Sequence, residues 1–409
     1  MNCRHCQTEL KHVFCDLKTC PPSNAMVRSD GLNQKETYFP LKIFTCNKCW
    51  LVQVDEVEKA ADIFNEEYTY FSSFSQSWLR HAKGYVEYMI SRFGFDENSL
   101  ILEIASNDGY LLQYFHQKGI PVLGVEPSAN TAREAEKKGI KSIIDFFGSR
   151  LANSDALSTK ADLIIGNNVL AHVPDINDFV RGVKIALSPI GINTFEFPHL
   201  CQMIKNNQFD TIYHEHFSYL SLTTVKSIFN ANGLEIFDVQ ELPTHGGSLR
   251  IFVKHKENNL LNIEKSVDKF LNSEKSLGID NIEYYESFQG KVNSIKYDFI
   301  EFLIGQKKKN KKIIGYGAAA KGNTLLNYCG IKGNDLIDFV VDASPHKQNK
   351  YLPGSRIPVL GIDSIIENKP DLIIIFPWNL KEEISKQLAY TKAWNAKFVI
   401  AIPQLLVFD

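Results

Sequence analysis

Short apolar runs alternate with helix-like stretches along most of this chain, and this alternation constrains its fold more than any other feature. Four such runs stand at residues 100–105, 122–125, 163–165 and 192–197, and four more at 313–317, 336–342, 372–376 and 398–402. Strands separated by helices are typical of a parallel, doubly wound sheet. The sequence therefore predicts an α/β fold with two such units.

Three further patterns connect these units. From Trp78 to Phe93 apolar residues recur at alternating spacings of three and four, which predicts an amphipathic helix. Residues 234–239 and 248–253 are separated by a short turn with Pro and Gly, and we expect them to form an antiparallel hairpin that closes the first sheet. The polar stretch 254–302 is expected to be a helical connection.

Two C-x2-C pairs stand near the N-terminus, Cys3-Arg-His-Cys6 and Cys46-Asn-Lys-Cys49. Each pair can present two thiolates to one tetrahedral zinc ion from a tight turn. Four thiolates fill the coordination shell, which indicates a structural metal. The alternative ligands that the sequence leaves open are His5, His12, Cys15 and Cys20.

Length and composition limit the classes of function. At about 150 residues per domain, the 409 residues give two to three domains. We expect a zinc-binding domain at 1–75, a cofactor-binding domain at 76–255 and a C-terminal α/β domain at 256–409. The net charge of −2 offers no basic stripe for nucleic acid. No apolar stretch approaches a membrane span and no signal peptide is evident, so we expect a cytoplasmic monomer or weak dimer.

The turn Glu103-Ile-Ala-Ser-Asn-Asp-Gly109 follows the first strand of the middle unit. Its acidic residues would repel a pyrophosphate and attract the sulfonium and amino groups of S-adenosylmethionine. Glu126, after the next strand, can accept the ribose hydroxyls, and Asp145 with Phe146 can hold the adenine. Any one of these acidic residues could equally cap a helix, but their order resembles the class I methyltransferases, with an alanine in place of the first glycine of the loop. The expected cofactor-binding residues are Glu103, Ala105, Asn107, Gly109, Glu126, Pro127, Asp145, Phe146 and Asn168.

The densest cluster of ionisable side chains lies at 210–219 and contains Tyr213, His214, Glu215 and His216. Two histidines two positions apart share a face only in an extended segment, and lie about 200° apart in a helix. A shared metal is therefore disfavoured if the segment starts a helix. A base with an orienting partner fits better.

At this cluster the sequence resembles the sugar C-methyltransferases that act on nucleotide-linked 4-keto-6-deoxyhexoses, including the 3-C-methyltransferases of antibiotic-sugar pathways. The likeness spans essentially the whole chain. Besides the cysteine pairs and 103–109, its motifs are Pro21-Pro22-Ser-Asn, Glu67-Tyr68-Thr-Tyr70, Asn168-Val-Leu-Ala-His172, Tyr213-His-Glu215-His216, Thr244-His-Gly-Gly247, Gly315-Tyr-Gly317-Ala-Ala-Ala-Lys321 and Pro345-His-Lys347-Gln348. The resemblance implies active-site roles for Tyr68, His172, Tyr213, Glu215 and His216.

The chemistry of such a reaction assigns these roles. Carbon beside a ketone becomes nucleophilic only after a base removes a proton, and the charge then gathers on the ketone oxygen. We expect His216 to be the base and Glu215 to hold a sugar hydroxyl or to orient the base. Tyr213, Tyr68 and His172 are candidate donors to the enolate oxygen. A sugar O-methyltransferase is an alternative.

A second glycine-rich turn, 315–322, satisfies most of the dinucleotide fingerprint, and Asp342 ends the next strand. An NAD-dependent oxidoreductase is therefore another alternative, as is a zinc-ribbon module that recruits RNA or protein. We prefer a vestigial cofactor turn that binds the diphosphate of the sugar nucleotide, although a turn that binds nothing stays open. The expected substrate-binding residues are Tyr70, Glu196, His245, Gly246, Gly247, Tyr316, Lys321, Asn323 and Lys347.

Overall fold

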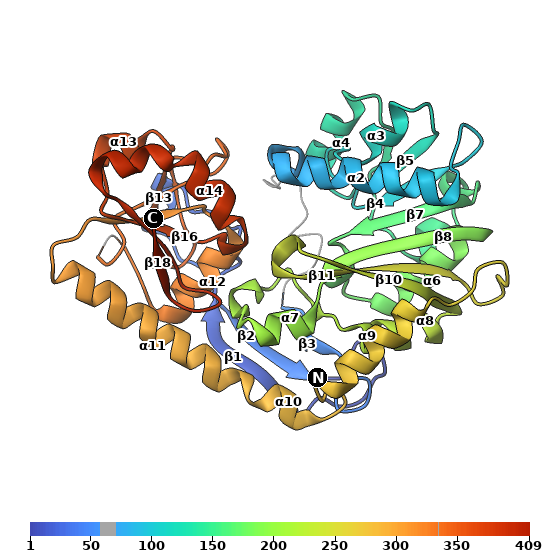
Figure 1. Ribbon diagram of the computed structural model, residues 1–409, viewed down its shortest axis with the longest axis horizontal. Helices are drawn as coiled ribbons and strands as arrows, with labels where there is room; N and C mark the ends of the chain where they lie inside the picture. The colour runs from blue at the N-terminus through green and yellow to red at the C-terminus, as the bar shows by residue number, and fades with distance from the viewer. Residues whose placement is uncertain (58–70, 334) are drawn as a thin grey trace.

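The computed structural model describes residues 1–57, 71–333 and 335–409, arranged around three sheets (Figure 1). The predicted site residues Tyr68 and Tyr70 lie outside the described residues. Within these ranges no helix is long and apolar enough to cross a membrane.

The central sheet has seven strands in the order β10-β11-β8-β7-β4-β5-β6. The five strands from β6 to β8 are parallel, and the hairpin of β10 and β11 is added antiparallel to β8, as predicted. The strands are β4 (Ile101–Ile104), β5 (Val122–Val125), β6 (Ser142–Ile143), β7 (Ala161–Asn167), β8 (Leu187–Pro198), β10 (Leu234–Leu242) and β11 (Ser248–His255).

Helices cover both faces of this sheet because successive strand residues point to opposite sides. Ile101 packs with α2 and α3 on one face, whereas Leu102 packs with α6 and α8 on the other. The predicted amphipathic helix is α2, which begins after Ser75, whose side chain accepts the N–H of Trp78, and ends at Gly94. The helices of this unit are α2 (Gln76–Phe93), α3 (Leu112–His116), α4 (Ala129–Glu136), α5 (Ser149–Ala152), α6 (Ile176–Ala186), α7 (Leu200–Lys205) and α8 (Leu222–Ala231).

The N-terminal block contributes three strands to a small antiparallel sheet. Its order is β1-β2-β3-β9, with β1 (His12–Cys20), β2 (Phe39–Thr45), β3 (Val52–Val54) and β9 (Ser218–Tyr219). Phe14 of β1 stacks on Phe288 with ring centroids 4.6 Å apart, so this sheet shares a core with the helices that lead to the C-terminal unit. The domain boundaries at 75 and 255 stay predictions.

The predicted helical connection consists of α9 (Lys265–Ser276), α10 (Ile282–Glu286) and α11 (Phe288–Lys307), which run along one side of the molecule between the two larger units (Figure 1). The C-terminal sheet follows in the order β14-β15-β13-β12-β16-β17-β18. Its strands are β12 (Ile313–Tyr316), β13 (Val340–Val341), β14 (Lys350–Tyr351), β15 (Pro358–Leu360), β16 (Leu372–Ile375), β17 (Lys397–Ile400) and β18 (Leu406–Phe408), with helices α12 (Ala320–Cys329), α13 (Ser364–Asn368) and α14 (Lys381–Gln387). The four predicted strands are confirmed, although β13 is much shorter than the apolar run at 336–342.

The carboxyl ends of the two parallel sheets meet. Gly246, in the hairpin turn beside the end of β8, packs against Trp378 so closely that a Cβ at Gly246 would come within 2.4 Å of the indole. Trp378 follows β16, the neighbour of β12. Ligands of doubly wound sheets bind at such carboxyl ends, so this junction is where a site is expected.

Candidate active site and zinc centre

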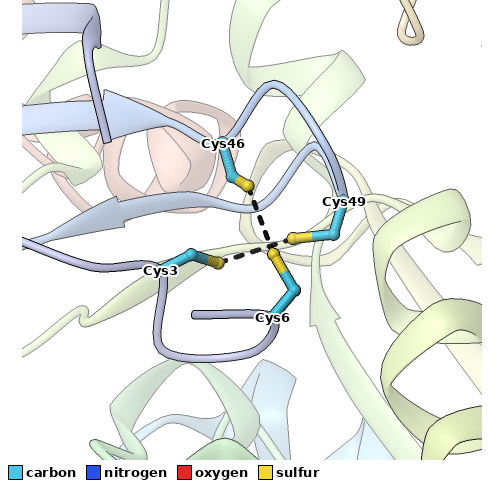
Figure 2. A group of neighbouring side chains, drawn as sticks. All are labelled: Cys3, Cys6, Cys46 and Cys49. Carbon is cyan, nitrogen blue, oxygen red and sulfur yellow. Dashed lines mark hydrogen bonds between the residues drawn. The ribbon is translucent and has the colours of Figure 1, made fainter. Parts of the chain in front are cut away.

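The four predicted zinc ligands converge in space (Figure 2). Cys46 and Cys49 come from the turn between β2 and β3, and Cys3 and Cys6 from the N-terminal loop. Two pairs of sulfur atoms, Cys3 with Cys49 and Cys6 with Cys46, lie 3.5 Å apart. Four sulfurs at about 2.3 Å from one zinc ion would be separated by about 3.8 Å, so the cluster fits the metal.

The alternative ligands lie elsewhere. His5 contacts Asn177 and Ser227 through its two ring nitrogens. Cys15 and Cys20 belong to β1 and are buried in the shared core, and burial raises the pKa of the Cys20 thiol to about 12. Neither cysteine belongs to the cluster of four, whose sulfur atoms all lie within 4.8 Å of one another.

The predicted cofactor turn leaves β4 with an unusual backbone. Ala105 has φ of 56° and Gly109 φ of 72°, both in the left-handed region. Glycine adopts this region with the least strain, so the backbone of Ala105 is strained. At Gly109 a Cβ would lie 2.6 Å from the Ile140 side chain, so the close packing of this turn requires glycine there.

Glu126 follows β5 and faces this turn. Its two carboxylate oxygens accept the main-chain N–H groups of Asn107 and Ser128, each at 2.9 Å. Burial raises the pKa of Glu126, whose side chain is almost completely enclosed. Glu103 is buried beside the same turn, and burial raises its pKa well above the ordinary value.

The carboxyl ends of β4 and β7 carry buried polar atoms that fit a polar ligand. The hydroxyl of Ser106, both amide atoms of Asn167 and Oδ1 of Asn168 have no hydrogen-bond partner among the described residues. Such atoms cost free energy unless a ligand or water satisfies them. The residues at this edge therefore fit S-adenosylmethionine.

The outer end of the predicted cofactor site is more open. Phe146 exposes 40% of its surface, as an aromatic ring that stacks on adenine would. One terminal nitrogen of Arg150 contacts both carboxylate oxygens of Asp145, and Pro127 is half-buried.

The histidine cluster is not at a helix start. Its segment lies between the one-turn helix η5 (Phe209–Thr211) and β9. Nδ1 of His216 lies 2.8 Å from the carbonyl oxygen of Thr211, and Nε2 lies 2.8 Å from the hydroxyl of Tyr213. A carbonyl only accepts, so Nδ1 carries the proton and the lone pair of neutral His216 is on Nε2. His214 turns away to the carbonyl of Pro40.

His172 stands beside this pair, with its ring centroid 4.7 Å from that of His216. Its Nδ1 donates to the main-chain carbonyl of Glu215 at 2.8 Å, so neutral His172 can accept but not donate through Nε2. The Glu215 carboxylate accepts the amide of Asn24 at 2.6 Å. The structure thus brings His172, Tyr213, Glu215 and His216 together.

Burial keeps these imidazoles neutral. It lowers the pKa of His172 to about 4 and that of His216 well below 6.5, with the charge of the neighbouring imidazole opposing protonation of His216 further. His245, in the hairpin turn, also has a pKa lowered to about 4 by burial. Its Nε2 lies 3.1 Å from the amide nitrogen of Asn168. This contact joins the hairpin turn to the cofactor edge.

Glu196, a predicted substrate-binding residue, occupies a buried hub with His81 and Arg250, which sequence reasoning did not predict. Its carboxylate, which has no solvent exposure, is bound by Thr244, His81 and Arg250 at 2.7–2.8 Å. Burial opposes ionisation of Glu196, but the hydrogen bond with His81 and the positive charge of Arg250 outweigh it and lower the pKa of Glu196 to about 2. Arg250 lies within a predicted strand. An arginine among apolar residues was the only sign in the sequence that this strand carries a buried charge.

The second glycine-rich turn is closed by Asp342, which accepts the N–H groups of Ala318 at 2.7 Å and Ser344 at 2.8 Å. Lys347 donates to the carbonyl of Ala318. Lys321 lies 4.4 Å above the Trp378 ring and donates to the Asn379 side chain at 2.9 Å.

The other predicted residues of this region are less open to a ligand. Asn323 is fully buried, and the Tyr316 hydroxyl contacts Gln387. Gly247 lies at the end of the hairpin turn, against Gln202.

Comparison with known proteins matches three family models in order along the chain. They are "Putative zinc binding domain" over 3–64, "Methyltransferase domain" over 78–239 and "C-methyltransferase C-terminal domain" over 243–403. The C-methyltransferase NovU of Streptomyces niveus is 34% identical over 373 residues, which are 90% of this chain and 87% of the relative.

Among solved structures, the magnesium protoporphyrin IX methyltransferase ChlM of Synechocystis PCC 6803 with bound SAM is 15% identical, with a TM-score of 0.34 over 44% of this chain and 79% of its own. The PH0226 protein of Pyrococcus horikoshii OT3 is 15% identical, with a TM-score of 0.37 over 46% of this chain and 95% of its own.

This relative matches nine-tenths of the chain, and the three family models follow one another along it. The family models assign a zinc-binding block, a methyltransferase domain and a C-methyltransferase C-terminal domain to the units that the structure shows. The chain therefore belongs to the C-methyltransferase family that includes NovU, and it is a zinc-binding, S-adenosylmethionine-dependent enzyme that transfers a methyl group to carbon.

Proposed function

We propose that the substrate is a nucleotide-linked 4-keto-6-deoxy sugar, methylated at C3 through an enolate. The observation that carries this proposal is the fixed tautomer of His216, whose Nδ1 donates to Thr211 and whose Nε2 lone pair faces the histidine cluster. A neutral base beside a cofactor edge is what carbon methylation next to a ketone needs.

In this proposal Nε2 of His216 takes the proton from the carbon beside the ketone. The C–H electron pair forms the enolate double bond, and the carbonyl of Thr211 stabilises the imidazolium that results. Tyr213 holds Nε2 before substrate arrives and then offers its hydroxyl to the enolate oxygen. When bound, S-adenosylmethionine supplies the methyl group, and the enolate carbon takes it with release of the thioether.

His172 and Glu215 have different parts in this proposal. Because neutral His172 has its proton on Nδ1, it accepts a substrate hydroxyl rather than donating to the enolate oxygen. His216 is oriented by Thr211 and Tyr213. We therefore assign the Glu215 carboxylate to a sugar hydroxyl, with Asn24 holding it.

We place the nucleotide on the C-terminal unit, at the end that faces the histidine cluster. Lys321 supplies the positive charge for a diphosphate, and burial, which lowers the pKa of this lysine, strengthens its attraction for an anion. Lys347 supports the turn through Ala318. Tyr68 remains a predicted donor to the enolate oxygen, and Tyr70 a predicted substrate contact. The enzyme would act in the cytoplasm as a monomer or weak dimer, without a nucleic-acid partner.

The test incubates the enzyme with S-adenosylmethionine and a panel of dTDP-, GDP- and CDP-linked 4-keto-6-deoxysugars. We expect one of them to gain the mass of one methylene, with carbon-13 NMR placing the new methyl on C3. A methyl group on oxygen would support the O-methyltransferase alternative instead. NAD reduction or oxidation with the same sugars, without methyl transfer, would support the oxidoreductase alternative.

A further inference from the structure

The segment that carries His216 is fastened to the C-terminal unit at two points. Nε1–H of Trp378 donates to Oδ2 of Asp210 at 2.8 Å, and the hydroxyl of Thr324 donates to the carbonyl oxygen of Ile212 at 2.8 Å. Trp378 follows β16, and Thr324 lies on α12. The two points flank Thr211, whose carbonyl holds Nδ1 of His216.

Both fastenings are buried. Asp210 and Thr324 are each 1% exposed, and Trp378 is 8% exposed. A buried carboxylate or carbonyl that loses its donor is left without compensation for its lost hydration, so neither bond is replaced cheaply by water. Burial accordingly raises the pKa of Asp210 to about 6, while Lys321 and the Trp378 N–H oppose this shift.

The orientation of one carbonyl decides what His216 can do. If the peptide unit after Thr211 turns, Nδ1 loses its acceptor, and the proton is then free to move to Nε2. The lone pair would then lie on the wrong nitrogen, as in other enzymes where a misplaced tautomer removes the base. The two bonds resist this turn because the Thr324 hydroxyl holds the main-chain carbonyl of Ile212, and the Trp378 N–H holds the side chain of Asp210, the residue before Thr211.

We propose that Trp378 and Thr324 are positioning residues for the methyl-transfer step, acting through the 210–212 main chain on the tautomer and direction of His216. This inference rests on the proposed role of His216 as base. It gives the C-terminal unit a part in the chemistry besides nucleotide binding. Lys321 belongs to the glycine-rich turn and lies over the Trp378 ring, so this turn contacts one of the two positioning residues directly.

The test compares Thr324→Val with Thr324→Ser in the full-length zinc-loaded enzyme. Valine has the shape of threonine but lacks the hydroxyl, whereas serine keeps it. We expect Thr324→Val to lower kcat about tenfold, equivalent to ~1.4 kcal/mol, with both KM values within about twofold of wild type. Thr324→Ser should restore most of the rate. Trp378→Phe removes the N–H donor and part of the indole that packs on Gly246 but keeps a ring beneath Lys321, so it should lower kcat at least as far as Thr324→Val.

A second readout follows the tautomer itself. In protein labelled with nitrogen-15 histidine, long-range proton–nitrogen NMR should show His216 protonated on Nδ1 in the wild type, and a mixture of tautomers in Thr324→Val and Trp378→Phe. Melting temperature and S-adenosylhomocysteine affinity report whether the variants fold. If the folded variants keep the wild-type kcat and tautomer, or if Thr324→Ser falls as far as Thr324→Val, the inference is wrong.

A His216→Asn variant separates this failure from failure of the proposed function. If His216→Asn retains turnover, His216 is not the base and the proposed function fails with it. If His216→Asn is inactive but Thr324→Val and Trp378→Phe are fully active, only the positioning role fails.

Discussion

The hydroxyl of Tyr213 lies 2.8 Å from Nε2 of His216, on the nitrogen opposite the one that donates to the Thr211 carbonyl. Both ring nitrogens are therefore engaged before any substrate binds. Tyr213 and His216 are three residues apart on one turn, so their contact is local. The hydrogen bonds from the C-terminal unit reach the preceding residues Asp210 and Ile212 instead. Substrate must displace the tyrosine hydroxyl to reach the lone pair.

His216→Asn is expected to lower kcat by at least about 10²-fold, the usual contribution of a general base. Asparagine keeps an N–H near the position of Nδ1, so the bond to Thr211 can persist, but it has no equivalent of Nε2. Wild-type enzyme with S-adenosylhomocysteine should exchange the α-hydrogen of the sugar into deuterated water, and the variant should not.

The matched control is His214→Gln, on the same segment. His214 lies against the Pro40 carbonyl and the Phe39 ring, and glutamine retains a donor for that carbonyl. We expect its turnover to stay near wild type. Near-normal methylation by His216→Asn would overturn the base assignment.

The sequence predicts well what periodicity controls. The helix α2 and the strands β4, β5, β7 and β8 lie where apolar runs placed them, because burial on one or both faces imposes the pattern. Strand β9 is two residues long, too short for any period to show, and it pairs with β3, which lies far away in the chain.

The site divides in the same way. The residue types of the cofactor turn and of the 213–216 segment could be recognised in the sequence, because acidic residues after strands and clustered histidines are unusual in themselves. Their partners were not, because the acceptor of His216 is a main-chain carbonyl and the Trp378–Asp210 bond spans 168 residues. Contacts of this kind depend on tertiary structure, which no local pattern encodes.

Glu126→Gln is expected to weaken S-adenosylhomocysteine binding by about 10- to 100-fold, because a hydrogen bond to a charged group contributes ~1.5–3 kcal/mol. The ribose would lose a carboxylate acceptor, and one of the two N–H groups at Asn107 and Ser128 would face an amide nitrogen. Calorimetry with the sugar nucleotide should give an unchanged Kd. Equal losses for both ligands would show that the whole fold, rather than the cofactor site, depends on Glu126.

Freshly purified protein is expected to contain about one zinc ion per chain, and Cys46→Ser should lose it. Structural zinc contributes ~10–16 kcal/mol in small domains, so the variant should unfold the N-terminal block and lower the melting temperature sharply. Cys329→Ser is the control, because this buried cysteine lies outside the cluster. Metal analysis that finds no zinc in wild-type protein would contradict the assignment.

The pH dependence of kcat/KM tests the environment of the base. A base acts in its unprotonated form, so activity is lost as the pH falls through its pKa in the free enzyme. Because burial lowers the pKa of His216 well below 6.5, the rate should stay level from pH 7.5 down past 6.5 and fall only at lower pH. A midpoint at or above 6.5 would show that a solvated group, and not buried His216, controls the acid limb.

Stability has to be followed over the same range, because other histidines titrate there. The pKa values of His172 and His245 are lowered to about 4 in the folded protein, against 6.5 when unfolded. Between these values the unfolded chain binds more protons than the folded one, so the free energy of unfolding decreases as the pH falls from 6.5 to 4. Urea unfolding at several pH values should show this decrease, and His245→Gln should flatten it. Rates are then compared only where the enzyme remains folded, so that a loss of activity in folded enzyme reports protonation of the base itself.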